Sequence, residues 1–194
     1  ADAARADSLR AALERIEADR HLAEARAREQ AAAADRKRQQ AAAAAARARQ
    51  EALARPAGPG VGEPRSQLTS PVAGSIVRTF GQDTGAGPAN GLTFQAPPGA
   101  RVVSPCGGRV AFAGPFRSYG LLVIVDCGGG WHFVLAGLDR LDTAAGRPVA
   151  AGEPVGAMAV WDPRSPAATR PSLYVELRRH GEPVNPAPFL RARS

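Results

Sequence analysis

The sequence predicts a long N-terminal α-helix followed by a mainly-β domain of antiparallel sheets, of the barrel or sandwich type. Composition divides the chain, because all 17 prolines and all 21 glycines of the 194 residues lie after residue 55. Beyond residue 70, short β-prone segments alternate with turns rich in Gly and Pro. We therefore expect a helical segment over residues 1–55, a linker over 56–70 and a globular domain over 71–194.

Residues 1–55 combine 23 alanines with 12 basic and 9 acidic side chains and contain no aromatic residue. These residue types favour a helix but offer too few large side chains to fill a core. Leu9, Leu13 and Ile16 follow a four–three spacing that continues mostly through small residues. This seam suits close packing against a second helix, so we expect a coiled-coil segment. A solvated single helix held by ion pairs four residues apart is the alternative.

The predicted helix ends at Pro56, which cannot continue it. Residues 56–70 (PAGPGVGEPRSQLTS) hold few side chains that can be buried, so we expect a Pro/Gly linker. Such a linker would free the β domain from the helix.

Short β-strands are expected throughout the globular domain, at intervals of roughly ten residues. They cover residues 75–80, 92–95, 101–104, 108–113, 121–126, 131–136, 154–160 and 172–178. Residues 121–125 (LLVIV) are apolar on both faces, which predicts a central strand.

Cys106 and Cys127 flank a predicted hairpin, and folding that hairpin about its centre brings the two residues opposite each other. A cross-strand disulfide is then feasible, and it would imply an oxidising compartment. Two ordinary buried thiols are the alternative.

Charge and hydropathy argue against two classes of partner. The net charge is +7, but basic and acidic residues are interleaved, with no aromatic platform and no long basic run. That pattern disfavours a nucleic-acid-binding protein. No run of about 18 apolar residues occurs, so we expect no transmembrane segment.

The common catalytic and metal-binding patterns are missing from the sequence. The three histidines, His21, His132 and His180, lie far apart, and no HxH, HExxH, CxxC or GxSxG motif occurs. A zinc site needs several converging His, Cys, Asp or Glu ligands. We therefore expect no metal ion and no cofactor.

Residues 146–156 (GRPVAAGEPVG) have the form GxxVxxGxxVG, which two β-arcs joined by glycine turns produce. The pattern occurs in biotinyl and lipoyl carrier domains and in LytM-type (lysostaphin-like) zinc endopeptidases. A carrier domain needs a lysine on its hairpin, and Lys37 is the last lysine of this chain. The resemblance to LytM domains extends over residues 71–190, through segments 71–76 (PVAGSI), 96–104 (APPGARVVS), 119–125 (YGLLVIV) and 184–186 (VNP).

The peptidase site of the LytM enzymes does not carry over to this sequence. That family binds zinc with the His and Asp of HxGxD and the second His of HLHF, and it uses two further histidines in catalysis. The corresponding positions here hold residues unsuited to that site: Ala89, Thr93, Gly137, Ser172 and Tyr174. The resemblance therefore implies a LytM fold without peptidase activity. An active endopeptidase with unusual ligands is the disfavoured alternative.

Residues 170–179 (RPSLYVELRR) resemble instead the EnvC-like murein hydrolase activators, which combine a coiled coil with a degenerate LytM domain. The resemblance implies a periplasmic, non-catalytic activator of zinc-dependent N-acetylmuramoyl-L-alanine amidases in cell division. It also implies that the vacated groove binds an amidase helix and that the coiled coil contacts an FtsEX-type division complex. A non-catalytic scaffold that binds peptidoglycan directly is the alternative.

The resemblance assigns a partner-binding groove to four residues. Tyr174 and Tyr119 match tyrosines of the activators, and Arg178 lies four residues beyond Tyr174 on the same strand face. The Arg178 guanidinium is suited to a carboxylate or to the C-terminal carbonyls of a helix. Asn90 stands at a position where activators can carry lysine, so a charge contact there is not carried over.

Overall fold

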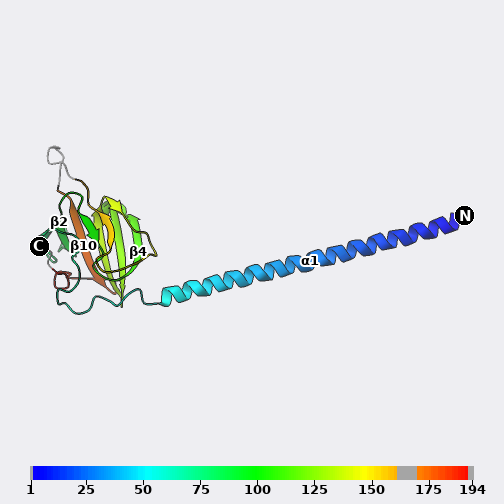
Figure 1. Cartoon of the computed structure of the whole chain (residues 1–194), viewed down its shortest axis with the longest axis horizontal. Coiled ribbons are helices and arrows are strands. Elements are labelled where there is room, and N and C mark those ends of the chain that lie inside the picture. The colour runs from blue at the N-terminus through cyan, green and yellow to red at the C-terminus, as the bar shows by residue number, and fades with distance from the viewer. Residues whose placement is uncertain (1, 161–169, 192–194) are drawn as a thin grey trace. The chain divides into compact units, whose positions relative to one another are not determined.

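The computed structural model describes residues 2–160 and 170–191. The chain divides into two compact units, residues 1–55 and residues 56–194 (Figure 1). The first unit is helical, and the second is mainly β.

The first unit is one helix, α1 (Asp2–Ala54), as the composition predicts. Its described side chains are exposed, and Leu9, Leu13 and Ile16 keep 62%, 52% and 63% of their accessible surface. Arg20 and Glu24 form an ion pair of 3.2 Å along the helix surface. The exposed leucines and isoleucine are compatible with a coiled coil, which remains a prediction.

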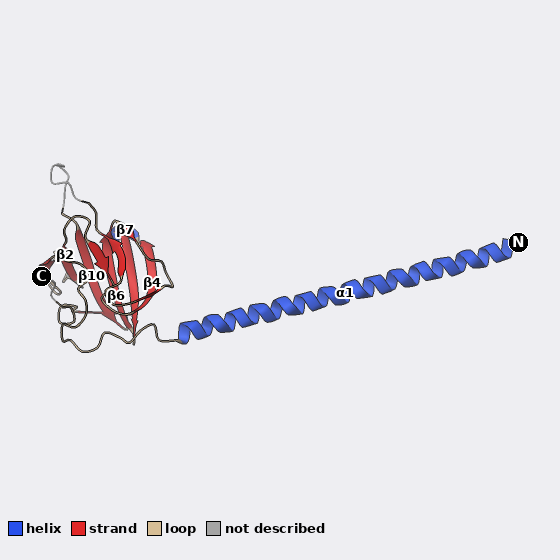
Figure 2. Ribbon diagram, viewed as in Figure 1, coloured by secondary structure: helices blue, strands red, loops and turns tan. Residues whose placement is uncertain are grey.

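The second unit is built mainly on an antiparallel sheet (Figure 2). Its strands are β1 (Ser75–Arg78), β2 (Leu92–Gln95), β4 (Gly108–Pro115), β5 (Leu121–Gly128), β6 (Trp131–Leu138), β8 (Pro148–Val149), β10 (Ser172–Arg179) and β11 (Glu182–Val184). The order across the sheet is β1-β2-β10-β6-β5-β4-β8, and β11 pairs with β10. The predicted central strand, β5, lies between β6 and β4.

A smaller antiparallel sheet has the order β3-β9-β7. It consists of β3 (Arg101–Val103), β9 (Pro154–Ala157) and β7 (Arg140–Leu141). Each predicted strand is found, but the sequence missed β7, β8 and β11, because two or three residues cannot show an alternating pattern. The first strand ends at Arg78, earlier than predicted, since the chain turns where the Gln82 N–H donates to the Thr79 carbonyl.

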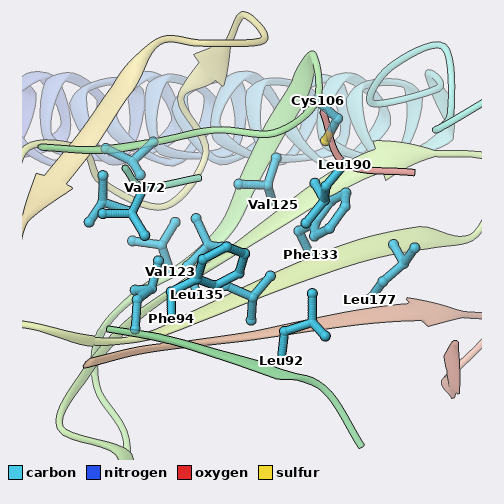
Figure 3. Packing of buried hydrophobic residues seen from close by; sticks show 14 of the residues in the cluster. Val72, Leu92, Phe94, Cys106, Val123, Val125, Phe133, Leu135, Leu177 and Leu190 are labelled. Atoms are coloured by element: carbon cyan, nitrogen blue, oxygen red, sulfur yellow. The ribbon is translucent and has the colours of Figure 1, made fainter. Parts of the chain in front are cut away.

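The core lies on one face of the larger sheet, where strands β5, β6 and β10 each send alternate side chains inward (Figure 3). These include Val123, Phe133 and Leu177, all with no accessible surface. Val102 of β3 and Val155 of β9 are equally buried in the same cluster. The opposite face of the larger sheet is therefore left to form a surface.

Cys106 and Cys127 form the predicted disulfide, so the alternative of two free thiols is wrong for this structure. Their Cα atoms lie 5.8 Å apart, and both residues are buried in the core cluster. The bond ties the segment before β4 to the end of β5.

The segment 56–70 differs from the predicted free linker, because it packs on the β unit. The Gly60 N–H donates to the Cys127 carbonyl at 2.6 Å, and Val61 is buried. Leu68 exchanges backbone hydrogen bonds with Phe189 and Arg191. The Gly and Pro content predicts flexibility, but glycine also permits close approach of two backbones. A side chain at Gly58, for example, would collide with the Gly107 carbonyl.

In the described residues, α1 is the only α-helix, and it is too polar to cross a membrane.

Candidate functional site

Strand β10 carries the polar residues of the candidate site on the sheet face opposite the core. Leu173, Val175 and Leu177 point into the core and have no accessible surface. The side chains between them, Tyr174 and Glu176, therefore lie on the outer face, followed by Arg178. This period of two brings Tyr174 and Arg178 to one surface.

Two of the positions that the resemblance equates with peptidase residues, Tyr174 and Thr93, lie side by side in the sheet. Tyr174 pairs with Thr93 of β2 on one side and with Ala136 of β6 on the other. The Tyr174 ring lies against Gly91, where an added Cβ would come within 3.1 Å of it. The Tyr174 ring thus covers part of the region where the resemblance predicts the lost zinc site.

Gly137 and Ser172 are also neighbours across β6 and β10. Gly137 has a positive φ of 97°, and a Cβ there would lie 2.7 Å from the Ser172 carbonyl oxygen. A histidine at position 137 would therefore require the backbone to shift. Ala89 is buried, with its N–H donating to the Gln82 carbonyl at 2.8 Å.

These five residues do not fit a zinc ion. Their side chains provide three neutral hydroxyls, from Thr93, Ser172 and Tyr174, and neither an imidazole nor a carboxylate. Protein zinc sites use Cys, His, Asp or Glu. Within residues 2–160 and 170–191, no cluster of three or more His, Cys, Asp or Glu side chains is placed to hold a metal.

Four aromatic rings form a chain across the outer face, from β4 to β10. Phe112 contacts Phe116 with centroids 5.9 Å apart, Phe116 contacts Tyr119 at 6.4 Å, and Tyr119 contacts Tyr174 at 6.1 Å. Phe116 and Tyr119 lie at the β4–β5 hairpin tip, where η1 (Arg117–Tyr119) forms a short turn. The hairpin tip therefore reaches Tyr174 of β10 through Tyr119.

Beside this chain of rings lies an apolar groove of about 320 Å3. It is lined by Phe112, Phe116, Tyr119, Leu122, Ile124, Val134, Glu176 and Arg178. Sequence reasoning assigned only Tyr119 and Arg178 of these to a groove. For Leu122 and Ile124 the sequence held a partial signal, since residues 121–125 are apolar on both faces: Leu122 and Ile124 line the groove, while Val123 and Val125 fill the core.

Glu176 and Arg178 form an ion pair at the edge of the groove. The Arg178 Nη1 donates to Glu176 Oε1 at 2.6 Å, and its Nε donates to the Gly181 carbonyl at 2.9 Å. Glu176 is 8% exposed, and its burial raises the pKa of the carboxyl, with Arg178 opposing that rise. Two bonds thus hold the guanidinium in place.

Tyr174 keeps its hydroxyl protonated at neutral pH. Burial, followed by the neighbouring Glu176 carboxylate, raises the pKa of Tyr174 to about 12. Tyr119 is 49% exposed, and Asn90 is exposed next to Gly91, beside the Tyr174 ring. The structure therefore brings the two tyrosines into contact, with Arg178 farther along β10 and Asn90 near the Tyr174 ring.

The model of peptidase family M23 matches residues 87–186, which is more than half of the chain and includes the five positions that we predict to be degenerate. The chain belongs to peptidase family M23. The LytM domains that the sequence resembles are members of this family.

Curated relatives include a murein hydrolase activator, a cell division protein and a lipoprotein. The chain is 34% identical over 132 residues to the murein hydrolase activator EnvC of Escherichia coli K12, covering 68% of this chain and 30% of that protein. It is 30% identical over 131 residues to the cell division protein DipM of Caulobacter vibrioides, covering 63% and 21%. A lipoprotein NlpD/LppB homolog of Pseudomonas aeruginosa is 30% identical over 139 residues, covering 71% and 43%. The chain thus spans less than half the length of these relatives.

Solved structures agree on the fold of the second unit. A Pseudomonas aeruginosa protein assigned to the M23 peptidases superposes with a TM-score of 0.55 at 27% identity, covering 76% of this chain and 60% of its own. Lysostaphin superposes with a TM-score of 0.53 at 18% identity, covering 64% and 54%. The predicted LytM fold is therefore confirmed.

Proposed function

We propose that this protein is a non-catalytic activator of zinc-dependent N-acetylmuramoyl-L-alanine amidases in cell division. The proposal is based on the composition and shape of the outer face of the sheet. Its peptidase positions hold Thr93, Ser172 and Tyr174 in place of zinc ligands, and an apolar groove adjoins them. A surface that has no zinc-ligating side chains but has an apolar groove is suited to binding a protein partner.

The residue types support the proposed absence of peptidase activity. Neutral hydroxyls at Thr93 and Tyr174 are poor substitutes for carboxylate and imidazole ligands, and Gly137 has no side chain to act as a general acid or base. The nearest carboxylate on β10, Glu176, is paired with Arg178. EnvC, which is named as an activator, is similar to this chain over 132 residues.

The partner in this proposal is an amidase helix that docks along Tyr174, Tyr119 and Arg178. Arg178 is held at the groove edge by Glu176 and Gly181, so its position is fixed before any partner binds. A guanidinium fixed in advance loses little conformational entropy on binding a carboxylate or a helix C-terminus.

We place the protein in the periplasm, with α1 as a coiled-coil segment that contacts an FtsEX-type division complex. The buried Cys106–Cys127 disulfide supports an oxidising compartment. The exposed apolar residues at the start of α1 support a helical partner for that segment.

Dye release from labelled sacculi tests the proposal. The reactions contain a zinc amidase from the same organism, the amidase with this chain, the amidase with residues 56–194, and the chain alone. We expect release above the amidase's own rate only when both proteins are present. Release by the chain alone would show peptidoglycan hydrolysis and overturn the proposal. Binding to sacculi with no stimulation of the amidase would favour the scaffold.

A further inference from the structure

A second hollow, of about 430 Å3, lies next to the smaller sheet of the β unit. The described residues that line it are none of those that line the apolar groove. They come from the end of segment 56–70, from β3, from β9 and the turn before it, and from the chain after β11: Thr69, Ser70, Arg101, Val103, Gly152, Pro154 and Arg191. The hollow is therefore a separate candidate site.

Two arginines supply positive charge to this hollow. The Arg101 and Arg191 residues are exposed, and within residues 2–160 and 170–191 neither guanidinium forms an ion pair or a side-chain hydrogen bond. The pKa of Asp142 is lowered first by its hydrogen bond with Arg140 and, to a smaller extent, by Arg101. Both oxygens of that carboxylate accept bonds from Arg140, at 2.8 and 3.1 Å. The donors of Arg101 and Arg191 are therefore left for a ligand.

Several backbone N–H groups of the lining are already used within the fold. Those of Val103, Gly152 and Arg191 donate to backbone carbonyls at 2.8, 2.7 and 2.7 Å, and Pro154 has no N–H. Phosphate sites commonly rely on a nest of such N–H groups. Recognition in this hollow therefore falls to side chains, and the planar fork of a guanidinium matches a carboxylate through two parallel bonds.

Apolar atoms border the same hollow. Val103 is 6% exposed, and Pro154 is exposed at the start of β9. The carboxylate of the neighbouring Glu153 accepts the Ala150 N–H at 2.8 Å, and Glu153 does not line the hollow. A ligand that carries a carboxylate beside a small apolar side chain matches both parts of this lining. The stem peptides of peptidoglycan have that chemistry, because they combine free carboxylates with the methyl groups of alanine.

We propose that this hollow binds a free carboxylate of a peptidoglycan stem peptide. Arg101 and Arg191 contact the carboxylate, and the Thr69 hydroxyl is a further donor at the wall of the hollow. This inference rests on the proposed function, which places the protein at the cell wall. It gives the wall a surface of its own, so that the wall and a partner on the outer face of the larger sheet do not compete for the same residues.

Binding of a purified disaccharide–tetrapeptide to the full chain tests this inference. A second sample of the same compound, with its carboxyls converted to methyl amides, lacks the negative charge. We expect Arg101→Gln and Arg191→Gln each to weaken binding of the free acid about tenfold. Arg78→Gln is the matched control, since Arg78 is exposed on β1 and lies outside the hollow. The control should bind as the wild type does.

Two further measurements use the wild-type chain. The methyl-amide sample should bind at least tenfold more weakly than the free acid, and added salt should weaken binding of the free acid. Vesicles of phosphatidylglycerol are the third probe. If the chain binds these vesicles through Arg101 and Arg191 but does not bind the peptide, the ligand is a lipid phosphate and the inference is overturned. Thermal melting verifies that each variant is folded.

The remaining outcomes separate this site from the proposed function. If folded Arg101→Gln and Arg191→Gln bind the peptide as the wild type does, or if the wild type does not bind it, the site is wrong. Loss of peptide binding in Tyr174→Ala, Arg178→Glu alone would place the peptide on the outer face and overturn the site. Stimulation of the amidase without peptide binding would leave the activator function standing. Peptide binding that depends on Arg101 and Arg191, without stimulation of any zinc amidase, would leave the site standing and remove that function.

Discussion

Glu176 is a buried carboxylate that pairs with the neighbouring Arg178, although its burial costs desolvation free energy. It lies between Tyr174 and Arg178 on the outer face of β10, and its carboxylate pairs with the Arg178 guanidinium. Burial destabilises the charged form more than Arg178 stabilises it, so the pKa of Glu176 is raised. We infer that Glu176 positions Arg178, and that its charged form lowers the free energy of unfolding of the protein.

Replacing Glu176 by Gln should alter the pH dependence of stability. A carboxyl with a raised pKa in the folded state binds its proton more tightly there than in the unfolded chain. Its contribution is therefore complete below the unfolded pKa and is lost as pH rises through the folded pKa. Since Gln stays neutral, Glu176→Gln should match the wild-type free energy of unfolding near pH 4. It should exceed that free energy at neutral pH by less than about 1 kcal/mol.

Urea unfolding of both proteins at the two pH values measures this difference. The comparison is made between variant and wild type, so the titration of the other carboxyls cancels. If Glu176→Gln were less stable than the wild type at neutral pH, the ion pair would be net stabilising and the prediction would be wrong.

At the scale of single elements, the disulfide closes the β4–β5 hairpin at its open end. Cys106 and Cys127 are 21 residues apart in sequence, and both are buried. Cross-linking a loop of that size stabilises a protein by about 3 kcal/mol through the unfolded chain. The double substitution of both cysteines by Ala should therefore lower the melting temperature by several degrees.

Thermal melting with and without a reductant checks this prediction. The wild-type protein should melt lower in reductant, and the double Ala variant should be insensitive to it. Equal melting temperatures for the oxidised wild type and the variant would mean that the bond adds no stability.

We expect the segment 56–70 to contribute to the stability of the β unit, and two truncations test this. Removing residues 1–55 takes away a helix that is a separate compact unit, so the melting temperature of the remainder should change little. Removing residues 1–70 also deletes buried Val61 and the backbone bonds of Leu68. That longer truncation should melt at least several degrees lower, as expected for losing a buried side chain and backbone bonds. Identical melting temperatures for the two truncations would instead support the interpretation of residues 56–70 as a free linker.

The alternation of apolar residues was enough to predict the longer strands and the central position of β5. It could not predict the groove, because an apolar second face on residues 121–125 fits deep burial and partner binding equally well. The hairpin itself was predicted, but the backbone conformation of its tip could not be. Arg117 adopts a positive φ of 44°, which is unusual for a residue other than glycine, and no local pattern signals it. The ring contacts of Phe116 and Tyr119 depend on that turn.

At the scale of the whole molecule, the chain joins a helical unit to an M23 domain in which we propose that a binding surface has replaced the chemistry. The family resemblance predicted the degenerate positions, and the structure added the chain of aromatic rings and the apolar groove beside Tyr174. Regulation by such a domain requires that the partner contact the outer face of the sheet. That requirement is the central claim.

The double variant Tyr174→Ala, Arg178→Glu tests this claim most directly, in the dye-release assay with a responsive amidase. Arg179→Glu is the control, since it makes the same charge change on the neighbouring residue, whose guanidinium contacts Trp131. With folding verified by thermal melting, we expect the double variant to fail to stimulate the amidase while the control stimulates it as the wild type does. Stimulation by the double variant at the wild-type level would contradict the claim that the partner contacts this face.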